Sequence, residues 1–207
     1  MEEVRKGYVQ IYTGNGKGKT TCSIGLAMRA LGAGMKVFIH QVGFFKCREV
    51  SEVKFIHSLQ SKGYPIQLNQ SGTPNFIIGK PAKEDIERAR KSYNQIISMF
   101  RQSSSKSEDE KSSCKSSASP ESSSELGDFV QYNMFILDEI LSCISLGIFS
   151  EEDIIQLMEE KPKEVELILT GRGATERVIE KADLVTEMKE IKHYYHAGVP
   201  ARIGIEM

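Results

Sequence analysis

The chain has 207 residues, of which 40% are apolar and 27% are charged, and its formal net charge is −1. This size suits one α/β domain with a complete hydrophobic core and gives no reason to expect two domains. The near-neutral charge argues against a general nucleic-acid-binding surface, and no apolar stretch reaches the roughly 20 residues of a membrane span or resembles a secretory signal.

The first predicted strand, residues 8–12 (YVQIY), leads into the sequence TGNGKGKTT at residues 13–21 and a predicted helix that ends near Ala33. Three glycines let successive backbone N–H groups turn toward one point, Lys19 adds positive charge there, and the hydroxyl of Thr20 suits Mg²⁺. The general pattern G-x-x-x-x-G-K-[ST] has a glycine where this chain has Thr13. The stretch therefore predicts a variant polyphosphate-binding loop at the start of a helix.

Further strands and helices are predicted in the next third of the chain. Residues 36–42 (KVFIHQV) indicate a second strand, and Lys54–Ile56 and Ile66–Leu68 are shorter strand candidates. Pro81 then opens a long amphipathic helix whose apolar stripe is expected to pack in the core.

Residues 103–124 interrupt this alternation, because 12 of these 22 residues are serine and most of the others are charged. Such a composition buries too little apolar surface to offset the entropy lost on ordering. We therefore expect a disordered insert at residues 102–127 within a single domain that spans residues 1–207. A phosphorylated regulatory loop is the alternative interpretation.

Order is predicted to return with the apolar run Met134–Leu137, which ends at Asp138 and Glu139. This pattern is typical of a buried parallel strand whose carboxylates emerge at its carboxyl end. Mg²⁺ prefers oxygen ligands, so Thr20 and Glu139 are expected to bind it, with Asp138 as the second choice among the acids. A charge pair at the N-terminus of a helix is the alternative for the two acids.

The remaining elements complete the predicted fold. Ser150 is expected to cap a helix, residues 165–170 (VELILT) form a buried strand before Gly171–Gly173, and residues 184–186 form a last strand. The alternation predicts an α/β fold of the P-loop NTPase (RecA-like) type, with a mostly parallel sheet and helices on both faces. Ligands of such sheets bind at the carboxyl ends of the strands, where Arg172 is a candidate phosphate or substrate clamp.

The four cysteines are scattered and form no CxxC pair, so we expect free thiols in a reducing cytosol and a cytoplasmic protein. In the tail, Lys192–Tyr195 mixes cationic and aromatic groups that suit contact with a cofactor. The residues alone thus predict an ATP- and magnesium-binding protein. A phosphotransferase or NTPase acting on another small molecule and a non-catalytic nucleotide-binding regulator both stay open.

The sequence TGNGKGKTT resembles the loop of the P-loop-type ATP:corrinoid (cob(I)alamin) adenosyltransferases, which also lack the first glycine. Further blocks similar to this family follow in order: LDE at 137–139, LTGRG at 169–173, ADLVTEM at 182–188, KH at 192–193, AGV at 197–199 and ARIGIE at 201–206. Together these blocks cover nearly the whole chain outside the serine-rich stretch.

The resemblance implies transfer of the 5′-deoxyadenosyl group of ATP to the Co(I) of a corrinoid (cobalamin, cobinamide or cobyrinic acid a,c-diamide), with release of tripolyphosphate. It also implies a role in the biosynthesis or salvage of adenosylcobalamin, an ATP bound in the reverse sense to other P-loop proteins, and Mg²⁺ or Mn²⁺ as cofactor. A reduced flavoprotein is the implied electron donor and a homodimer the implied assembly. Neither a nucleic acid nor a membrane is expected as a partner.

The loop and the strand-end acids supply the expected catalytic residues, Lys19, Thr20 and Glu139, and the expected metal ligands, Thr20, Glu139 and Asp138. The family's Gly-Phe-x-Trp segment, which helps to displace the lower cobalt ligand, corresponds to Gly72–Phe76 in a chain that has no tryptophan. The residues expected to contact ATP or the corrinoid are Gly14, Asn15, Gly16, Lys17, Gly18, Lys19, Thr20, Thr21, Arg29, Phe76, Arg172 and His193.

Overall fold

The computed structural model describes residues 6–42, 50–72, 79–109 and 131–206. Its centre is a six-stranded sheet in the order β3-β2-β4-β5-β1-β6, in which every neighbouring pair is parallel. The strands are β1 (Val9–Thr13), β2 (Val37–Gln41), β3 (Ile66–Gln70), β4 (Met134–Asp138), β5 (Glu166–Thr170) and β6 (Leu184–Glu187). The predicted α/β class is confirmed.

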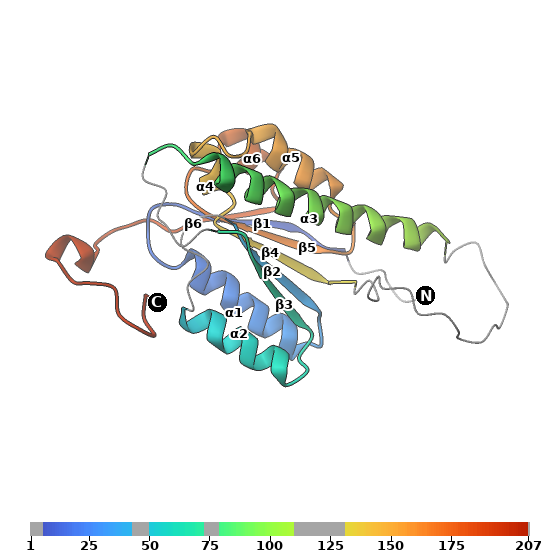
Figure 1. Ribbon diagram of the computed structural model, residues 1–207, viewed down its shortest axis with the longest axis horizontal. Helices are drawn as coiled ribbons and strands as arrows, with labels where there is room; N and C mark the ends of the chain where they lie inside the picture. Colours follow the sequence, from blue (N-terminus) through green and yellow to red (C-terminus); the bar gives the residue numbers. More distant parts are fainter. Residues whose placement is uncertain (1–5, 43–49, 73–78, 110–130, 207) are drawn as a thin grey trace.

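Helices cover both faces of the sheet, as expected. Figure 1 shows α1 and α2 on one face and α3, α4, α5 and α6 on the opposite face. The helices are α1 (Lys19–Gly32), α2 (Ser51–Ser61), α3 (Lys83–Asp109), α4 (Ser142–Ser145), α5 (Glu151–Glu160) and α6 (Glu176–Lys181), followed by the 3₁₀ helix η1 (Tyr194–Ala197). In the described part of the chain, none of them is both long and apolar enough to cross a bilayer.

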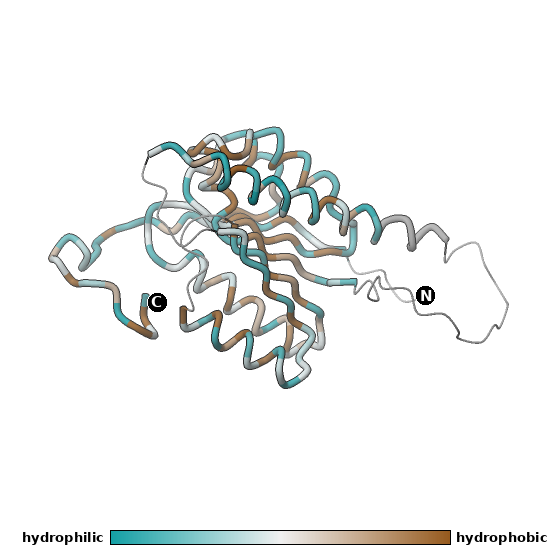
Figure 2. Tube along the Cα trace, in the orientation of Figure 1, coloured by the Kyte–Doolittle hydropathy of each residue, from teal (hydrophilic) through white to brown (hydrophobic). Residues whose placement is uncertain are grey.

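The core has two layers because successive strand residues point to opposite faces. On one face, Ile39 and Ile136 are fully buried against α1 and α2; on the other, Phe135 packs edge-on against Phe100 of α3 with 4.9 Å between ring centroids. Figure 2 shows apolar residues concentrated along the central strands. Burial of each such side chain contributes about 1.5–3 kcal/mol to the free energy of unfolding.

The sheet topology places the carboxyl ends of β1, β4 and β5 side by side. Tyr12 pairs with Thr170 across β1 and β5, and Leu137 pairs with Leu169 across β4 and β5. The loop before α1 and the acids that end β4 therefore share one edge of the sheet, where ligands of open α/β sheets bind.

One predicted strand is wrong, since Lys54–Ile56 lie inside helix α2. Val53 and Ile56 are buried against the sheet, whereas Phe55 is 46% exposed. Burial at a spacing of three residues is the period of a helix face, whereas a half-buried strand buries every second residue. The predicted strand at Ile66–Leu68 is confirmed as part of β3.

The serine-rich stretch begins as a helix, because α3 continues to Asp109. Ser103, expected to lie in the irregular insert, is 7% exposed, and its hydroxyl donates to the carbonyl of Met99 over 3.1 Å. This bond to the preceding turn is a regular helical arrangement for serine. Residues 110–127 of the expected insert lie outside the described residues, so their disorder stays a prediction.

The cap of α5 is confirmed at Ser150. Its hydroxyl accepts from the backbone N–H of Asp153 over 3.1 Å, and the Asp153 carboxylate accepts from the N–H of Ser150 over 2.6 Å. Both partners of a capping box are therefore present at the start of this helix.

Of the four cysteines, Cys22 and Cys143 fall in the described residues, and both are free thiols. Cys143 is fully buried, and this burial raises the pKa of its thiol to about 12. It therefore stays a neutral core group at physiological pH.

Candidate active site

The loop between β1 and α1 has a backbone that only glycine accommodates. Gly14 and Gly18 have φ angles of 97° and 126°, in a region that side chains with a Cβ rarely adopt. At Gly14 and Gly16, an added Cβ would lie 2.6 and 2.7 Å from the carbonyl oxygen of Met188. The N–H of Gly16 donates to that same oxygen over 2.6 Å. The loop is thus held against the chain that follows β6.

Lys19 folds back over this loop from the first turn of α1. Its Nζ donates to the carbonyls of Gly14 and Gly16 over 2.6 and 2.9 Å, and the residue is 7% exposed. Burial lowers the pKa of its ammonium, while the nearby charge of Glu139 acts in the opposite direction. The loop therefore carries an enclosed positive charge beside its own backbone.

Asp138 lies at the centre of the polar contacts at this edge. Oδ1 of its fully buried carboxylate accepts from the hydroxyls of Thr20 and Thr170 over 2.9 and 2.8 Å. Oδ2 accepts from Nε2 of Gln41 over 3.3 Å, and Gln70 in turn donates to Oε1 of Gln41 over 2.9 Å. The acid given second place from the sequence is thus the one that contacts Thr20.

Glu139 faces a different part of the edge. Its backbone φ of 67° is the only positive value among the described non-glycine residues, and such a conformation costs about 1 kcal/mol or more. Its N–H donates to Oγ1 of Thr170 over 2.9 Å, and its Oε2 accepts from Ser142 over 2.7 Å. The N–H of Arg172 donates to the same Ser142 hydroxyl over 2.9 Å. Ser142 therefore connects Glu139 to the loop after β5.

Arg172 has an exposed side chain in that loop. Burial is the main cause of the lowered pKa of Lys19, and the positive charge of Arg172 acts in the same direction. Arg172 is therefore close enough to Lys19 for their charges to interact.

The other predicted contacts divide into two groups. Asn15 and Thr21 are exposed residues of the loop and of the first turn of α1, as predicted. Arg29 is exposed ten residues beyond Lys19, roughly 15 Å along the helix axis, so α1 carries it away from the loop. Its contact with ATP or the corrinoid stays a prediction. Phe76 lies outside the described residues.

His193 precedes η1 as its N-cap, and its Nδ1 accepts from the N–H of Tyr195 over 3.0 Å. Its ring lies 4.8 Å from that of Tyr194, measured between centroids. His196 contacts Glu190 over 2.8 Å, and no cluster of three or more His, Cys, Asp or Glu groups suited to a metal occurs in the described ranges. The contacts described for His193 and His196 are thus with other residues of the tail, and the role of His193 in cofactor binding stays a prediction.

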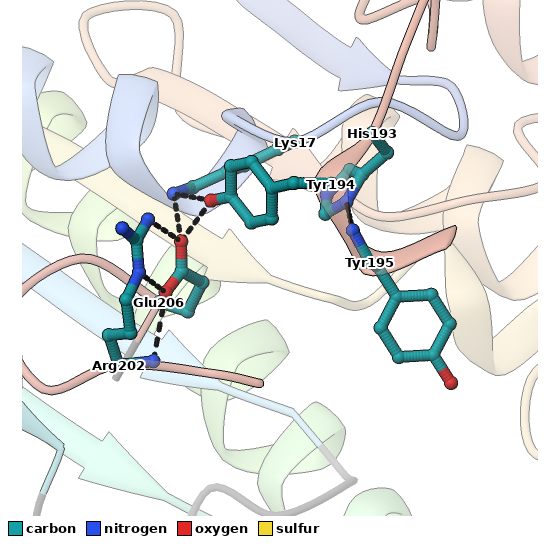
Figure 3. A network of polar contacts seen from close by, with 6 residues as sticks. All are labelled: Lys17, His193, Tyr194, Tyr195, Arg202 and Glu206. Carbon is teal, nitrogen blue, oxygen red and sulfur yellow. Dashed lines mark hydrogen bonds and ion pairs between the residues drawn. The ribbon is translucent and has the colours of Figure 1, made fainter. Parts of the chain in front are cut away.

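The tail reaches the loop through Lys17, a contact that the sequence did not predict. We call residues 188–206 the C-terminal strap (Figure 1). Nζ of Lys17 donates to the carboxylate of Glu206 over 2.9 Å and to the hydroxyl of Tyr194 over 3.1 Å (Figure 3). Tyr194 lies in the segment Lys192–Tyr195 that was expected to contact a cofactor, whereas Glu206 was not an expected site residue, because no local pattern joins positions so far apart in sequence.

Thr170 and Gln41 were also missed. The available signal was their place at the ends of predicted strands, since parallel strands bring their carboxyl ends to one edge. Which strand neighbours which depends on the sheet order, and the sequence pattern does not give that order.

Comparison with known proteins agrees with this geometry. The model of the family described as ATP:corrinoid adenosyltransferase BtuR/CobO/CobP matches residues 5–207. The chain is 30% identical over 208 residues to a Sinorhizobium corrinoid adenosyltransferase, covering 97% of this chain and 80% of that protein. It is 29% identical over 202 residues to the corrinoid adenosyltransferase of Escherichia coli K12, covering 97% and 86%. The corresponding values for corrinoid adenosyltransferase CobA of Salmonella typhimurium LT2 are 26% over 201 residues, 97% and 86%.

The residues matched by the family model include the loop at 13–21, the acids at the end of β4 and the strap. The chain therefore belongs to the ATP:corrinoid adenosyltransferase family, as its resemblance in sequence implied, and is an adenosyltransferase that acts on corrinoids.

Proposed function

We propose that residues 13–21 bind the triphosphate of ATP and that this triphosphate leaves whole when the 5′-deoxyadenosyl group moves to the Co(I) of a corrinoid. The observation that carries this proposal is that Lys19 bonds to the loop after β1 while Thr20, next to it in α1, bonds to Asp138 at the carboxyl end of β4. These groups suit a polyphosphate and its metal ion, and they are positioned where charge accumulates on a leaving triphosphate.

The proposed step balances without a protein base. The electron pair of Co(I) forms the bond to C5′ of the ribose, the C5′–O bond breaks, and its electron pair leaves with the triphosphate oxygen. Cobalt is oxidised formally to Co(III), and no proton moves. Backbone N–H groups of the loop and the ammonium of Lys19 stabilise the charge on the departing triphosphate.

Mg²⁺, or Mn²⁺ in its place, is the proposed cofactor. Thr20 with Asp138 and Glu139 would hold it, and the hydroxyl and carboxylate oxygens of these residues are the donors that such cations prefer. When bound, the ion supplies positive charge to the triphosphate oxygens. Asp138 is buried against Thr20 and accepts from its hydroxyl, while Glu139 has a half-buried carboxylate that accepts from Ser142.

The test is anaerobic incubation of the enzyme with ATP, Mg²⁺ and chemically reduced cob(I)alamin. We expect a photolabile adenosylcobalamin spectrum and one tripolyphosphate per cobalt alkylated. In Lys19→Ala, turnover is expected to fall by about a hundredfold or more, because charge stabilisation at the leaving group is lost. Formation of ADP or orthophosphate as the only phosphate products would refute the proposal.

A homodimer is the proposed assembly. β6 is an edge strand on which Leu184 and Val185 are 44% and 38% exposed, and Ile191 and Ile203 of the strap are each 86% exposed. Exposed apolar side chains beside an open sheet edge favour association with another chain. Light scattering is expected to give a dimer that Leu184→Lys dissociates, whereas Tyr64→Lys, at a 50% exposed site elsewhere, does not. A monomeric wild type at micromolar concentration would contradict this assembly.

A reduced flavoprotein remains the proposed electron donor that forms Co(I). Phe76 is the proposed group that helps the Co(II) corrinoid accept this electron. The cytoplasmic location expected from the sequence likewise stays a prediction.

A further inference from the structure

Glu206 is the acceptor for a cluster of cations at the end of the C-terminal strap (Figure 3). Besides Lys17, its carboxylate accepts from the Tyr194 hydroxyl, from Nε and Nη2 of Arg202 over 3.2 and 3.1 Å, and from the N–H of Arg202 over 2.9 Å. The Glu206 side chain is 15% exposed and that of Lys17 is 39% exposed. Several donors therefore fix the position of the carboxylate, and Lys17 forms an ion pair with it.

The rings and charges around the pair add to this arrangement. The guanidinium carbon of Arg202 and Nζ of Lys17 lie 5.1 and 5.8 Å from the centroid of the Tyr194 ring. The bond to Glu206 raises the pKa of Lys17, and the bonds from Arg202 and Tyr194 lower the pKa of Glu206. Both groups are therefore ionised at neutral pH.

The strap touches the phosphate loop at its other end as well. Met188 accepts from the N–H of Gly16 over 2.6 Å and donates to the carbonyl of Thr13 over 2.7 Å. In this structure a backbone donor of the loop and the ammonium of Lys17 are thus both satisfied by the strap. A triphosphate that binds the N–H of Gly16 and the ammonium of Lys17 must therefore break their bonds to the strap.

We propose that Glu206 is a positioning residue of the triphosphate site that acts through Lys17. Its carboxylate forms an ion pair with the Lys17 ammonium in the nucleotide-free enzyme. This ion pair breaks when the triphosphate binds and forms again as tripolyphosphate leaves. The inference rests on the proposed function, since it requires the triphosphate to bind at residues 13–21. Binding at the loop and docking of the strap are then reciprocally linked.

The test is calorimetric titration with inorganic tripolyphosphate and with ATP, using wild type, Glu206→Gln, Lys17→Met and the double variant. Removal of the competing carboxylate is expected to tighten binding of both ligands by about twofold to fivefold, the size of a partly exposed ion pair. Lys17→Met is expected to weaken binding. In the Lys17→Met background, Glu206→Gln is expected to have no further effect, because the coupling runs through Lys17.

Glu190→Gln is the matched control, because it removes the same charge from the strap but Glu190 pairs with His196. This variant is expected to bind tripolyphosphate as the wild type does. In steady state, Glu206→Gln is expected to lower both the KM for ATP and the inhibition constant of tripolyphosphate. Hydrogen exchange of residues 198–206 is expected to increase when ATP binds to the wild type.

The inference is overturned if Glu206→Gln binds tripolyphosphate no more tightly than wild type, or gains equally with and without Lys17. Failure of the proposed function has a different signature. In that case wild type itself forms no tripolyphosphate with cob(I)alamin, or does not bind tripolyphosphate at all. An active wild type with an unchanged Glu206→Gln titration rejects only the role of Glu206.

Discussion

Thr170 and Asp138 share a buried hydrogen bond of 2.8 Å between the ends of two neighbouring strands. The same Thr170 hydroxyl accepts from the N–H of Glu139, so one side chain fixes both acids of the site. Asp138 and Glu139 therefore both contact Thr170 without a further loop between them. The arrangement depends on β5 lying between β4 and β1, which is a property of the sheet order.

Thr170→Val is therefore expected to disturb the acids without changing the volume of the side chain. The N–H of Glu139 and one oxygen of Asp138 lose a buried partner, which lowers the free energy of unfolding by about 1–3 kcal/mol. Loss of an orienting group behind a metal ligand typically costs about 10- to 100-fold in metal affinity or activity. We expect a higher Mg²⁺ concentration for half-maximal adenosylation, measured with cob(I)alamin at saturating ATP. Thr170→Ser keeps the hydroxyl and serves as control; an unchanged Mg²⁺ requirement in Thr170→Val would contradict the role.

Local sequence sufficed for the parts of the site that lie within one short segment. The glycines, Lys19 and Thr20 follow one another along the chain, and their loop has the predicted form between β1 and α1. Asp138 at the end of β4 and Glu139 after it were equally visible, because an apolar run that ends in carboxylates identifies the end of a buried strand. Thr20 and the acids were expected to share one metal site at this edge of the sheet, and the structure shows Thr20 bonded to Asp138.

Contacts between distant segments were not predictable in the same way. Glu206 and Lys17 are separated by 189 positions, and only folding of the strap onto the loop joins them. The sequence also did not show which of the two acids contacts Thr20. The backbone at Glu139 has a positive φ, and its carboxylate lies toward Ser142. Short apolar runs failed for a different reason: Lys54–Ile56 suits a strand or a helix until the burial of Val53 is known.

The burial of His40 predicts that the free energy of unfolding depends on pH. It is 3% exposed, its Nε2 lies 3.1 Å from the hydroxyl of Ser71, and burial lowers its pKa from 6.5 to about 4. The unfolded chain therefore binds a proton on this residue between these two values, while the folded chain does not. The contribution of His40 to the free energy of unfolding is fully present above pH 6.5. It is lost as the pH decreases toward 4, by about 3 kcal/mol in total.

The measurement is chemical denaturation of wild type and His40→Gln at pH 7.5 and pH 5. Over this interval the wild type is expected to lose about 2 kcal/mol more of its free energy of unfolding than the variant, which has no group titrating at this position. His57→Gln, in α2, serves as the comparison at a helix position. Parallel pH profiles for wild type and His40→Gln would reject the assignment.

Ser150→Ala tests the capping box of α5 independently of the active site. Loss of the hydroxyl leaves the N–H of Asp153 without its cap, so the free energy of unfolding is expected to fall by about 0.5–2 kcal/mol. Adenosylation at saturating substrates is expected to stay at the wild-type level. Ser61→Ala, whose hydroxyl bonds only the carbonyl of Ser58 in the contacts described for it, is the control and is expected to change stability by less than about 0.5 kcal/mol. Equal losses in the two variants would contradict the cap.

Glu139 combines an unfavourable backbone conformation with a proposed metal-binding carboxylate, so two substitutions separate these properties. Glu139→Ala and Glu139→Gly both remove the carboxylate, and both are expected to raise the Mg²⁺ requirement and to lower the adenosylation rate. Glycine adopts a φ of 67° without strain, so Glu139→Gly is expected to be more stable than Glu139→Ala by about 1 kcal/mol. Denaturation curves measure this difference, and the Ala variant is the control for loss of the bond to Ser142. Full activity in either variant would exclude Glu139 from the metal site. A Gly variant that is no more stable than the Ala variant would show that the positive φ at residue 139 carries no energetic cost.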